Sequence, residues 1–204
     1  ALLLHDDFLY NKVDFNKDGF RDLPTGNLFS VLNRWKFENG KGFMAQFGVK
    51  VMTDEKTGGE TAFNPVKDKL TTNHYGLGIS TRRYEAFSKT GYVFPGKKYK
   101  SIGLQLMAFS HKQDSYFGIQ TYQANQQSVY ANLIYQSIIG NTNHKFRTGL
   151  SWVADRYEET IRAVLYKRTE RVPGGFFEYT FTPDAKLGMV AGIRSDYNNL
   201  YGWF

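Results

Sequence analysis

The residues with the clearest potential for chemistry form a run of oxygen-bearing side chains near the start of the 204-residue chain. Asp14, Asn16 and Asp18 stand at every second position, and Gly19 follows directly. Hard oxygen ligands at this spacing, followed by a glycine that permits a sharp reversal, match the first half of a calcium-binding loop. The spacing predicts one Ca²⁺ site. Its expected ligands are the side chains of Asp14, Asn16, Asp18 and Asp22 and the carbonyl oxygen of Phe20.

The loop departs from a helix-loop-helix calcium site at its second half. Thr25 stands at the twelfth position, where such a site has a bidentate glutamate, and Pro24 is incompatible with the helix that normally follows. The sequence therefore predicts at most an isolated calcium loop of weak affinity. A hydrophilic turn rich in Asp and Gly fits the same residues and stays open as the alternative.

Other catalytic and metal-binding chemistry has little support. The chain has no cysteine, and its four histidines, His5, His74, His111 and His144, show no paired ligand spacing. Ser110 and His111 are neighbours, and adjacent residues of a strand point to opposite faces, which argues against a catalytic dyad. The sequence contains neither a Gly-x-Ser-x-Gly elbow nor a phosphate-binding loop. We therefore predict that the chain is not an enzyme.

The elements that position these residues are strands, because apolar and polar residues alternate with a period of two. The alternation is clearest in the last sixty residues. One face carries the apolar residues that we expect to face lipid or its interface, and the other carries charged residues that we expect to face the lumen of a barrel. The first set contains Phe146, Leu150, Trp152, Phe177, Tyr179 and Ile193, and the second contains Arg147, Glu178 and Arg194.

Ring placement and composition favour a membrane barrel over a soluble sandwich. Trp152, Tyr157, Tyr179 and Phe181 are predicted to lie on the apolar face near strand ends, as in the aromatic girdles of outer-membrane barrels. Aromatic residues make up 17% of the chain and the mean hydropathy is −0.48, too polar for helical membrane spans. The net charge of +7 is scattered along the chain, which argues against nucleic acid as a partner.

The pattern of connections predicts an all-β fold of about eight antiparallel strands in up-and-down order. Residues 1–25 are expected to be a strand end that runs into a loop, and Arg82-Arg83 is expected to mark a bulge. Outer-membrane barrels alternate short periplasmic turns with longer outer loops. We expect short connections at 38–41, 95–98, 140–143 and at Pro183-Asp184-Ala185, and longer loops at 53–71, 112–121 and 157–169.

Two runs in the C-terminal part are similar to a known family. They are Glu170-Arg-Val-Pro-Gly-Gly-Phe-Phe-Glu-Tyr-Thr-Phe181 and Gly192-Ile-Arg-Ser-Asp-Tyr-Asn-Asn-Leu-Tyr-Gly202. These strand and turn motifs resemble the barrel of TonB-dependent outer-membrane receptors of the Bacteroidetes type. The resemblance extends over most of the chain, from the Asp14 loop to Phe204. It indicates a family of transporters without indicating the cargo.

The resemblance implies that residues 1–204 are a segment of a 22-stranded barrel in the cell outer membrane. The signal peptide, the plug domain and the remaining strands would lie outside this sequence. The whole protein would take up a scarce nutrient actively, such as a metal chelate, a siderophore or cobalamin. Its partners would be outer-membrane lipid, the small-molecule nutrient and, through the N-terminal part, the TonB energy-coupling complex.

Two other classes of protein remain open at this point. A complete eight-stranded outer-membrane barrel with a structural or adhesion role fits the strand number and the terminal aromatic Phe204, although Gly202 departs from the usual terminal pattern. A soluble calcium-binding β-sandwich fits the alternation, but the placement of the aromatic residues disfavours it.

Overall fold

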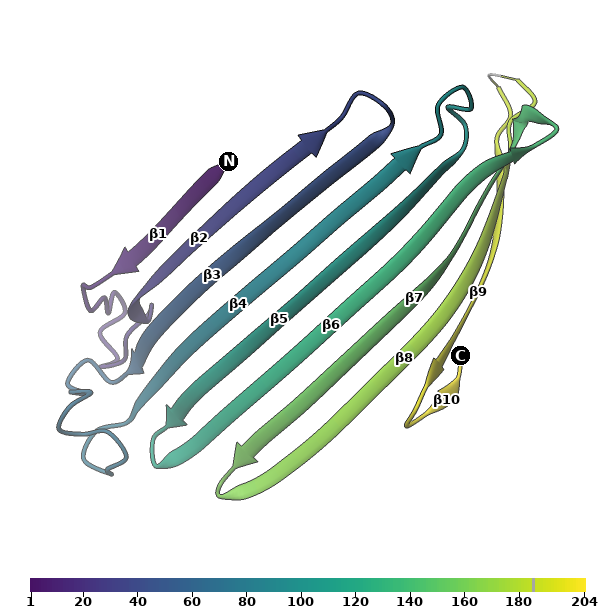
Figure 1. Ribbon diagram of the computed structural model, residues 1–204. Helices are drawn as coiled ribbons and strands as arrows, with labels where there is room; N and C mark the ends of the chain where they lie inside the picture. Colours follow the sequence, from purple (N-terminus) through teal and green to yellow (C-terminus); the bar gives the residue numbers. More distant parts are fainter. Residues whose placement is uncertain (185) are drawn as a thin grey trace.

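The computed structural model describes residues 1–184 and 186–204, which contain ten strands and no helix. All ten strands lie in one antiparallel sheet in chain order (Figure 1). The strands are β1 (Leu2–Leu9), β2 (Thr25–Glu38), β3 (Phe43–Gly59), β4 (Gly76–Val93), β5 (Ser101–Phe117), β6 (Gln120–Ile139), β7 (Asn141–Ile161), β8 (Val164–Phe181), β9 (Met189–Asn198) and β10 (Gly202–Trp203).

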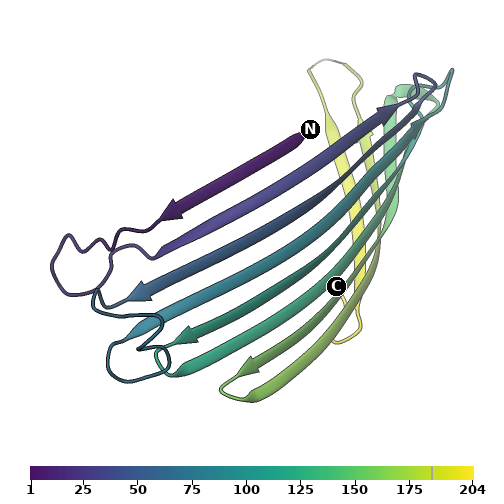
Figure 2. The ribbon, with the colours of Figure 1, turned by 60° about the vertical axis from the view of Figure 1, so that its left-hand side comes forward.

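The all-β class and the antiparallel up-and-down order are thus confirmed. The sheet is curved and open, with β1 at one edge and β10 at the other (Figures 1 and 2). Two strands add to the expected eight. The segment Leu2–Leu9 forms a full strand although its apolar residues do not alternate, and β10 is a bridge of two residues against β9.

The connections lie at two ends of the sheet, which we call the loop end and the turn end. At the loop end, lower left in Figure 1, residues 10–24 and 60–75 form long loops. At the turn end, residues 39–42, 94–100, 140 and 182–188 join the strands, and Ala185 of the predicted turn lies outside the described residues.

The predicted loops at 112–121 and 157–169 are wrong, and the predicted loop at 53–71 begins too early. Strand β5 continues to Phe117 and β6 begins at Gln120, while β7 and β8 are separated only by Arg162 and Ala163. These strand ends carry polar residues on both faces, such as Lys112 and Gln113 on β5 or Glu158 and Glu159 on β7, so they lack the alternation from which strands were predicted. Hydrogen bonds to the neighbouring strands keep them extended without an apolar face.

The register explains how residues far apart in sequence come to share a face. It runs from β3 through β4 to β5 without a shift at Arg82 or Arg83, so the predicted bulge is absent. The hairpin turns use backbone conformations with positive φ, 59° at Gly118, 49° at Arg162 and 67° at Ala163. Apart from a register shift between Ile138 and Ile139 at the turn end of β6, each long strand keeps its side chains alternating between the same two faces.

The sheet has almost no enclosed core. Within residues 1–184 and 186–204, Phe63 is the only buried hydrophobic side chain, 1% exposed. Large apolar side chains on the strands are exposed instead, including Leu150 at 65% and Ile193 at 74%. An apolar surface of this extent is unusual for a soluble monomer and calls for another medium or partner.

Candidate functional site: a two-faced sheet with a loop-covered end

The residues predicted to face lipid do share one face, which we call the apolar face. Cross-strand partners in the register point the same way, and Phe146 is opposite Tyr179 while Phe177 is opposite Ile193. The same register places Arg147 opposite Glu178, on the other face, which we call the polar face. The prediction that Tyr157 lies on the apolar face is wrong. Tyr157 lies opposite Arg168 on the polar face, because it is an odd-numbered residue in a strand whose even-numbered residues are apolar.

The apolar face is apolar only over part of the strand length. From Phe43 to Val51 on β3, the outward side chains and their partners on β4 are aromatic, aliphatic or small. This stretch of nine residues, the apolar band, matches the roughly 9–11 residues of a tilted membrane-spanning strand. Beyond it towards the loop end, the same face carries Thr53, Arg82 and Lys112. The outward side chains thus change from apolar to polar or charged within two residues along each of these strands.

Aromatic rings gather at the turn-end edge of the apolar band. Tyr135 lies 5.9 Å from Phe146, and Phe146 lies 6.0 Å from Phe177, measured between ring centroids. Phe43 and Tyr92 continue this belt on β3 and β4. Trp152, expected near a strand end, lies inside the band instead. It is four residues along β7 from Thr148, which lies at the turn-end edge of the band. At the loop-end edge the rings are fewer, with Tyr84 the clearest.

The polar face carries paired charges in the same stretch of the sheet. Arg194 binds Asp196 through two hydrogen bonds, Nε to Oδ2 at 2.6 Å and Nη2 to Oδ1 at 2.7 Å, and also donates to Ser151 Oγ at 3.0 Å. Asp196 is only 7% exposed, and it approaches Gly174 so closely that a Cβ there would lie 1.9 Å from Oδ1. Such crowding indicates that the polar face is the inner side of the curved sheet.

The polar network continues towards the loop end. The guanidinium of Arg83 pairs with Glu85 and stacks 3.9 Å from the centroid of the Phe109 ring. On β7 and β8, Arg168 lies 4.6 Å from the Tyr157 ring centroid and pairs with Glu170 at 2.7 Å. Paired charges, aromatic rings and amides on one continuous surface suit a water-filled space better than a packed interior.

The long loop 60–75 folds back over the loop end of the sheet. Its Phe63 ring covers Gly76 and lies 6.3 Å from the Tyr116 ring centroid. Two cations from the loop 10–24 hold the same segment, since Lys12 Nζ and Arg21 Nη2 donate to the carbonyl oxygen of Phe63 at 3.3 and 3.0 Å. The two long loops therefore form one packed unit.

Glu60 fixes the far end of this loop. Its carboxylate accepts the backbone N–H of Tyr75 at 2.8 Å and contacts His74 Nδ1 at 2.8 Å. The hydrogen bond from the Tyr75 backbone, and then that from His74, lower the pKa of Glu60 below its usual value. The carboxylate form of Glu60 therefore holds the two ends of the loop 60–75 together. We call these contacts of Glu60 with His74 and Tyr75 the Glu60 clasp.

The predicted calcium ligands lie in one curled loop. Asp14 accepts the backbone N–H groups of Asp18 at 3.2 Å and Gly19 at 3.0 Å, and Asp18 Oδ1 accepts that of Phe20 at 2.8 Å. Asp22 Oδ2 closes the loop by accepting the backbone N–H of Phe15 at 2.6 Å. Lys17 and Gly19 adopt positive φ values of 59° and 87°, which produce the reversal.

The hydrogen bonds within the loop use side-chain oxygens that a metal ion would need as ligands. Among the described residues, no group of three or more His, Cys, Asp or Glu side chains is placed to hold a metal ion. Each carboxylate offers about four lone-pair positions. The backbone contacts of Asp14, Asp18 and Asp22 therefore do not use every lone pair of these carboxylates. Asn16 donates to Asp18 Oδ2 at 3.0 Å through its amide nitrogen, and its Oδ1 accepts the backbone N–H of Asp18 at 3.2 Å.

The histidines are dispersed over the sheet and its loops. His74 belongs to the Glu60 clasp, and His144 hydrogen-bonds the hydroxyl of Tyr179. Ser110 lies opposite Tyr84 on the apolar face, while His111 lies opposite Arg83 on the polar face. The strand therefore separates the two side chains of the candidate dyad.

The sequence does not predict the packing of several residues at the loop end. Lys12, Arg21, Glu60 and Phe63 lie in irregular segments, where no periodicity marks a packed residue. The one available signal was Gly76 at the start of a strand, because a glycine within a strand often marks the close approach of another group.

Comparisons with protein-family models, with curated proteins and with solved structures give no match for this chain. No helix long and apolar enough to cross a membrane occurs in the part of the chain that the structure describes. A function for this chain therefore has to be inferred from the apolar band, the polar face and the packed loop end.

Proposed function

We propose that this chain forms part of the wall of a TonB-dependent receptor in the outer membrane, which takes up a scarce nutrient. The observation that carries the proposal is the apolar band. It exposes large apolar side chains over the length that a bilayer core requires, and it ends at a row of charged residues. In the bilayer these side chains contact lipid.

The open edges of the sheet support a wall with further strands. In lipid an unpaired strand edge costs several kcal/mol for each unsatisfied backbone group, so only closed barrels are stable there. Further strands of the same protein close the barrel next to β1 and β10. A 22-stranded barrel, with a plug that fills its lumen, is the form that the sequence resemblance implies.

In this proposal the polar face lines the lumen, and the loop end is the extracellular end. The unit formed by loops 10–24 and 60–75, together with the hairpin tips at 118–119 and 162–163, stands around the barrel mouth. The nutrient is a small molecule of the metal-chelate, siderophore or cobalamin class. Energy reaches the receptor from the TonB complex through the plug.

We also propose that the Asp14 loop binds one Ca²⁺ ion with the side chains of Asp14, Asn16, Asp18 and Asp22 and the carbonyl of Phe20. The support is a loop that is already curled by hydrogen bonds between its carboxylates and its backbone. When bound, the ion neutralises clustered carboxylates and holds the loop 10–24 in one shape.

The test uses the full-length protein, expressed in a Gram-negative host and followed by fractionation and uptake assays. We expect a heat-modifiable band in the outer-membrane fraction and nutrient uptake that stops when the proton-motive force is removed. Recovery of the protein in the soluble fraction would contradict the membrane assignment.

A second arm separates the receptor from the small barrel. Residues 1–204, refolded alone in detergent, should aggregate because both sheet edges remain open. A monodisperse, heat-modifiable monomer would favour a small self-closing barrel with a structural or adhesion role.

A further inference from the structure

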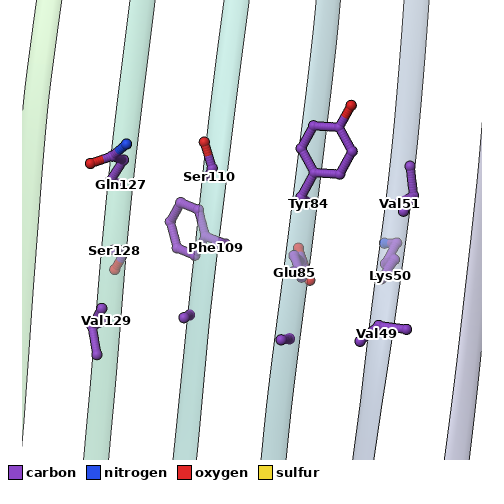
Figure 3. Close-up of a pocket in the computed structure, with 12 residues that line it drawn as sticks. Val49, Lys50, Val51, Tyr84, Glu85, Phe109, Ser110, Gln127, Ser128 and Val129 are labelled. Atoms are coloured by element: carbon purple, nitrogen blue, oxygen red, sulfur yellow. The ribbon is translucent and has the colours of Figure 1, made fainter.

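The apolar band is hollowed near its loop-end edge. Between Val49 and Val51 on β3 and Val129 on β6, the outward residues of β4 and β5 are the small Ala86 and Ala108. The resulting shallow groove has a volume of about 580 Å³, within the range of small-molecule sites. Figure 3 shows these strands with Tyr84, Ser110 and Gln127 at the loop-end side of the groove.

Directly beyond the groove, two cations stand side by side on the same face. Arg82 and Lys112 are cross-strand partners on β4 and β5, one row beyond Tyr84 and Ser110, and both are exposed. Lys112 Nζ lies 4.0 Å from Asp114 Oδ2, at the outer limit of an ion pair. Arg82 has no ion-pair partner among the described residues, whereas Arg83 on the opposite face pairs with Glu85.

The charged neighbours of this pair lie in the same row and in the row beyond it. The row continues through Asn125 to Glu158 and Lys167 on β7 and β8. The single carboxylate of Glu158 is already shared by Arg156 and Lys167, at 2.6 and 3.3 Å. The acidic residues Glu55 and Asp114 lie one row further from the groove. On β3 to β5 the cations therefore lie between the apolar groove and the carboxylates of Glu55 and Asp114.

We propose that the groove and the pair Arg82 and Lys112 form a binding site for a phospholipid of the surrounding leaflet whose headgroup carries a net negative charge. An acyl chain lies over Ala86 and Ala108, and the lipid phosphate binds the guanidinium of Arg82 and the ammonium of Lys112. The charge of the pair selects the occupant, because a chain in the groove places its headgroup at this row. The site rests on the proposed function, since it requires that the apolar band contact lipid.

The test measures lipid retained by the full-length protein in nanodiscs that contain phosphatidylglycerol and phosphatidylcholine, by native mass spectrometry. We expect the wild-type protein to retain phosphatidylglycerol preferentially. The double variant Arg82→Gln/Lys112→Gln should lose this preference by roughly thirtyfold, because each basic residue near the surface contributes about 1 kcal/mol. Filling the groove with Ala108→Leu should lower retention while leaving both cations in place.

The matched control is Lys50→Gln/Lys89→Gln, which removes two cations from the polar face and should leave lipid retention unchanged. Equal retention of both lipids by the wild-type protein, or an equal loss in the control, would overturn the proposal. Displacement of the lipid by millimolar inorganic phosphate would mean that the pair binds a free anion and that the groove plays no part.

The failure of this site can be told from the failure of the membrane assignment. A Leu150→Cys variant reports contact of the band with lipid through its reaction with a lipid-soluble reagent. Labelling of Leu150→Cys without any lipid preference would overturn the lipid site alone. The absence of labelling would overturn the membrane assignment and the lipid site together.

Discussion

The ring of Phe63 covers Gly76 so closely that a Cβ atom on Gly76 would lie 2.4 Å from the ring. Only glycine leaves room for the ring at this point, and the ring is the only buried large apolar group in the described part of the chain, 1% exposed. The contact joins the end of the loop 60–75 to the first residue of β4. It is therefore the point at which a small change should loosen the loop end without touching the rest of the sheet.

We predict that Phe63→Ala destabilises this loop by about 3–5 kcal/mol, and Gly76→Ala by about 1–3 kcal/mol. The first change leaves a cavity and the second displaces the ring. Limited proteolysis of the loop 60–75 in the full-length protein measures both effects as an increased cleavage rate. Val66→Ala is the control, because Val66 is 88% exposed. Equal cleavage of all three variants and the wild-type protein would show that the ring does not hold the loop.

The two faces of the sheet should react with different reagents. Phe177 and Glu178 are adjacent on β8 and point to opposite faces. We expect Phe177→Cys to react with a lipid-soluble maleimide and Glu178→Cys with a water-soluble one, measured in the membrane-embedded protein. Because the two positions are neighbours, their depth in the membrane is matched. Reaction of Glu178→Cys with the lipid-soluble reagent alone would place the polar face against lipid and contradict the assignment.

Calcium should bind weakly to the Asp14 loop. The carboxylate missing at Thr25 removes two oxygens and one charge, so we expect a Kd of about 10⁻⁴ to 10⁻³ M. Calorimetric titration of the full-length protein should show this binding, and Asp18→Ala should abolish it. Asp7→Ala removes a carboxylate from β1 and serves as the control. The same heat of binding in the wild-type protein and Asp18→Ala would mean that the loop is only a turn.

The clasp at Glu60 should open in acid. The pKa of Glu60 is lowered in the folded protein, first by the Tyr75 N–H and then by His74. The carboxylate therefore stabilises the loop fully above the ordinary pKa that Glu60 has in the unfolded chain. This contribution is lost as the pH falls from that value through the lower folded pKa.

Hydrogen exchange at the Tyr75 amide checks the prediction. Relative to Glu60→Gln at each pH, the wild-type amide should be better protected near neutral pH, and the difference should vanish in the acid range. A difference that persists unchanged to pH 2 would show that the charge of Glu60 is not what holds the loop.

The sequence predicted the sheet well wherever one face is apolar. On β7 and β8, Phe146, Leu150 and Phe177 were assigned to their correct face, because a single apolar side imposes the period of two. The same rule failed where both faces are polar, as at the ends of β5 and β7. There the strands extend because they pair with neighbours, and pairing leaves no trace in the composition of a single strand.

The turns show a second limit of prediction. The short connection predicted at 38–41 contains Asn39 and Gly40, a pair that is typical of hairpin turns, and Gly40 has a φ of 68°. Arg162 and Ala163 adopt the same region without either signal residue, so the hairpin between β7 and β8 was read as a long loop. Neighbouring strands hold these residues in a conformation that their own preferences disfavour.

The hairpin of β7 and β8 ends in a turn of only two residues, joined to strands that remain paired up to Ile161 and Val164. Those two partners hold the ends of any inserted segment close together, so a foreign peptide placed between Arg162 and Ala163 starts with its loop already closed. Each doubling of such an insert costs only about 0.6 kcal/mol more in chain entropy. The tip is thus a graft site, at which an epitope or a fluorescent label could be displayed without altering the register of the sheet below it.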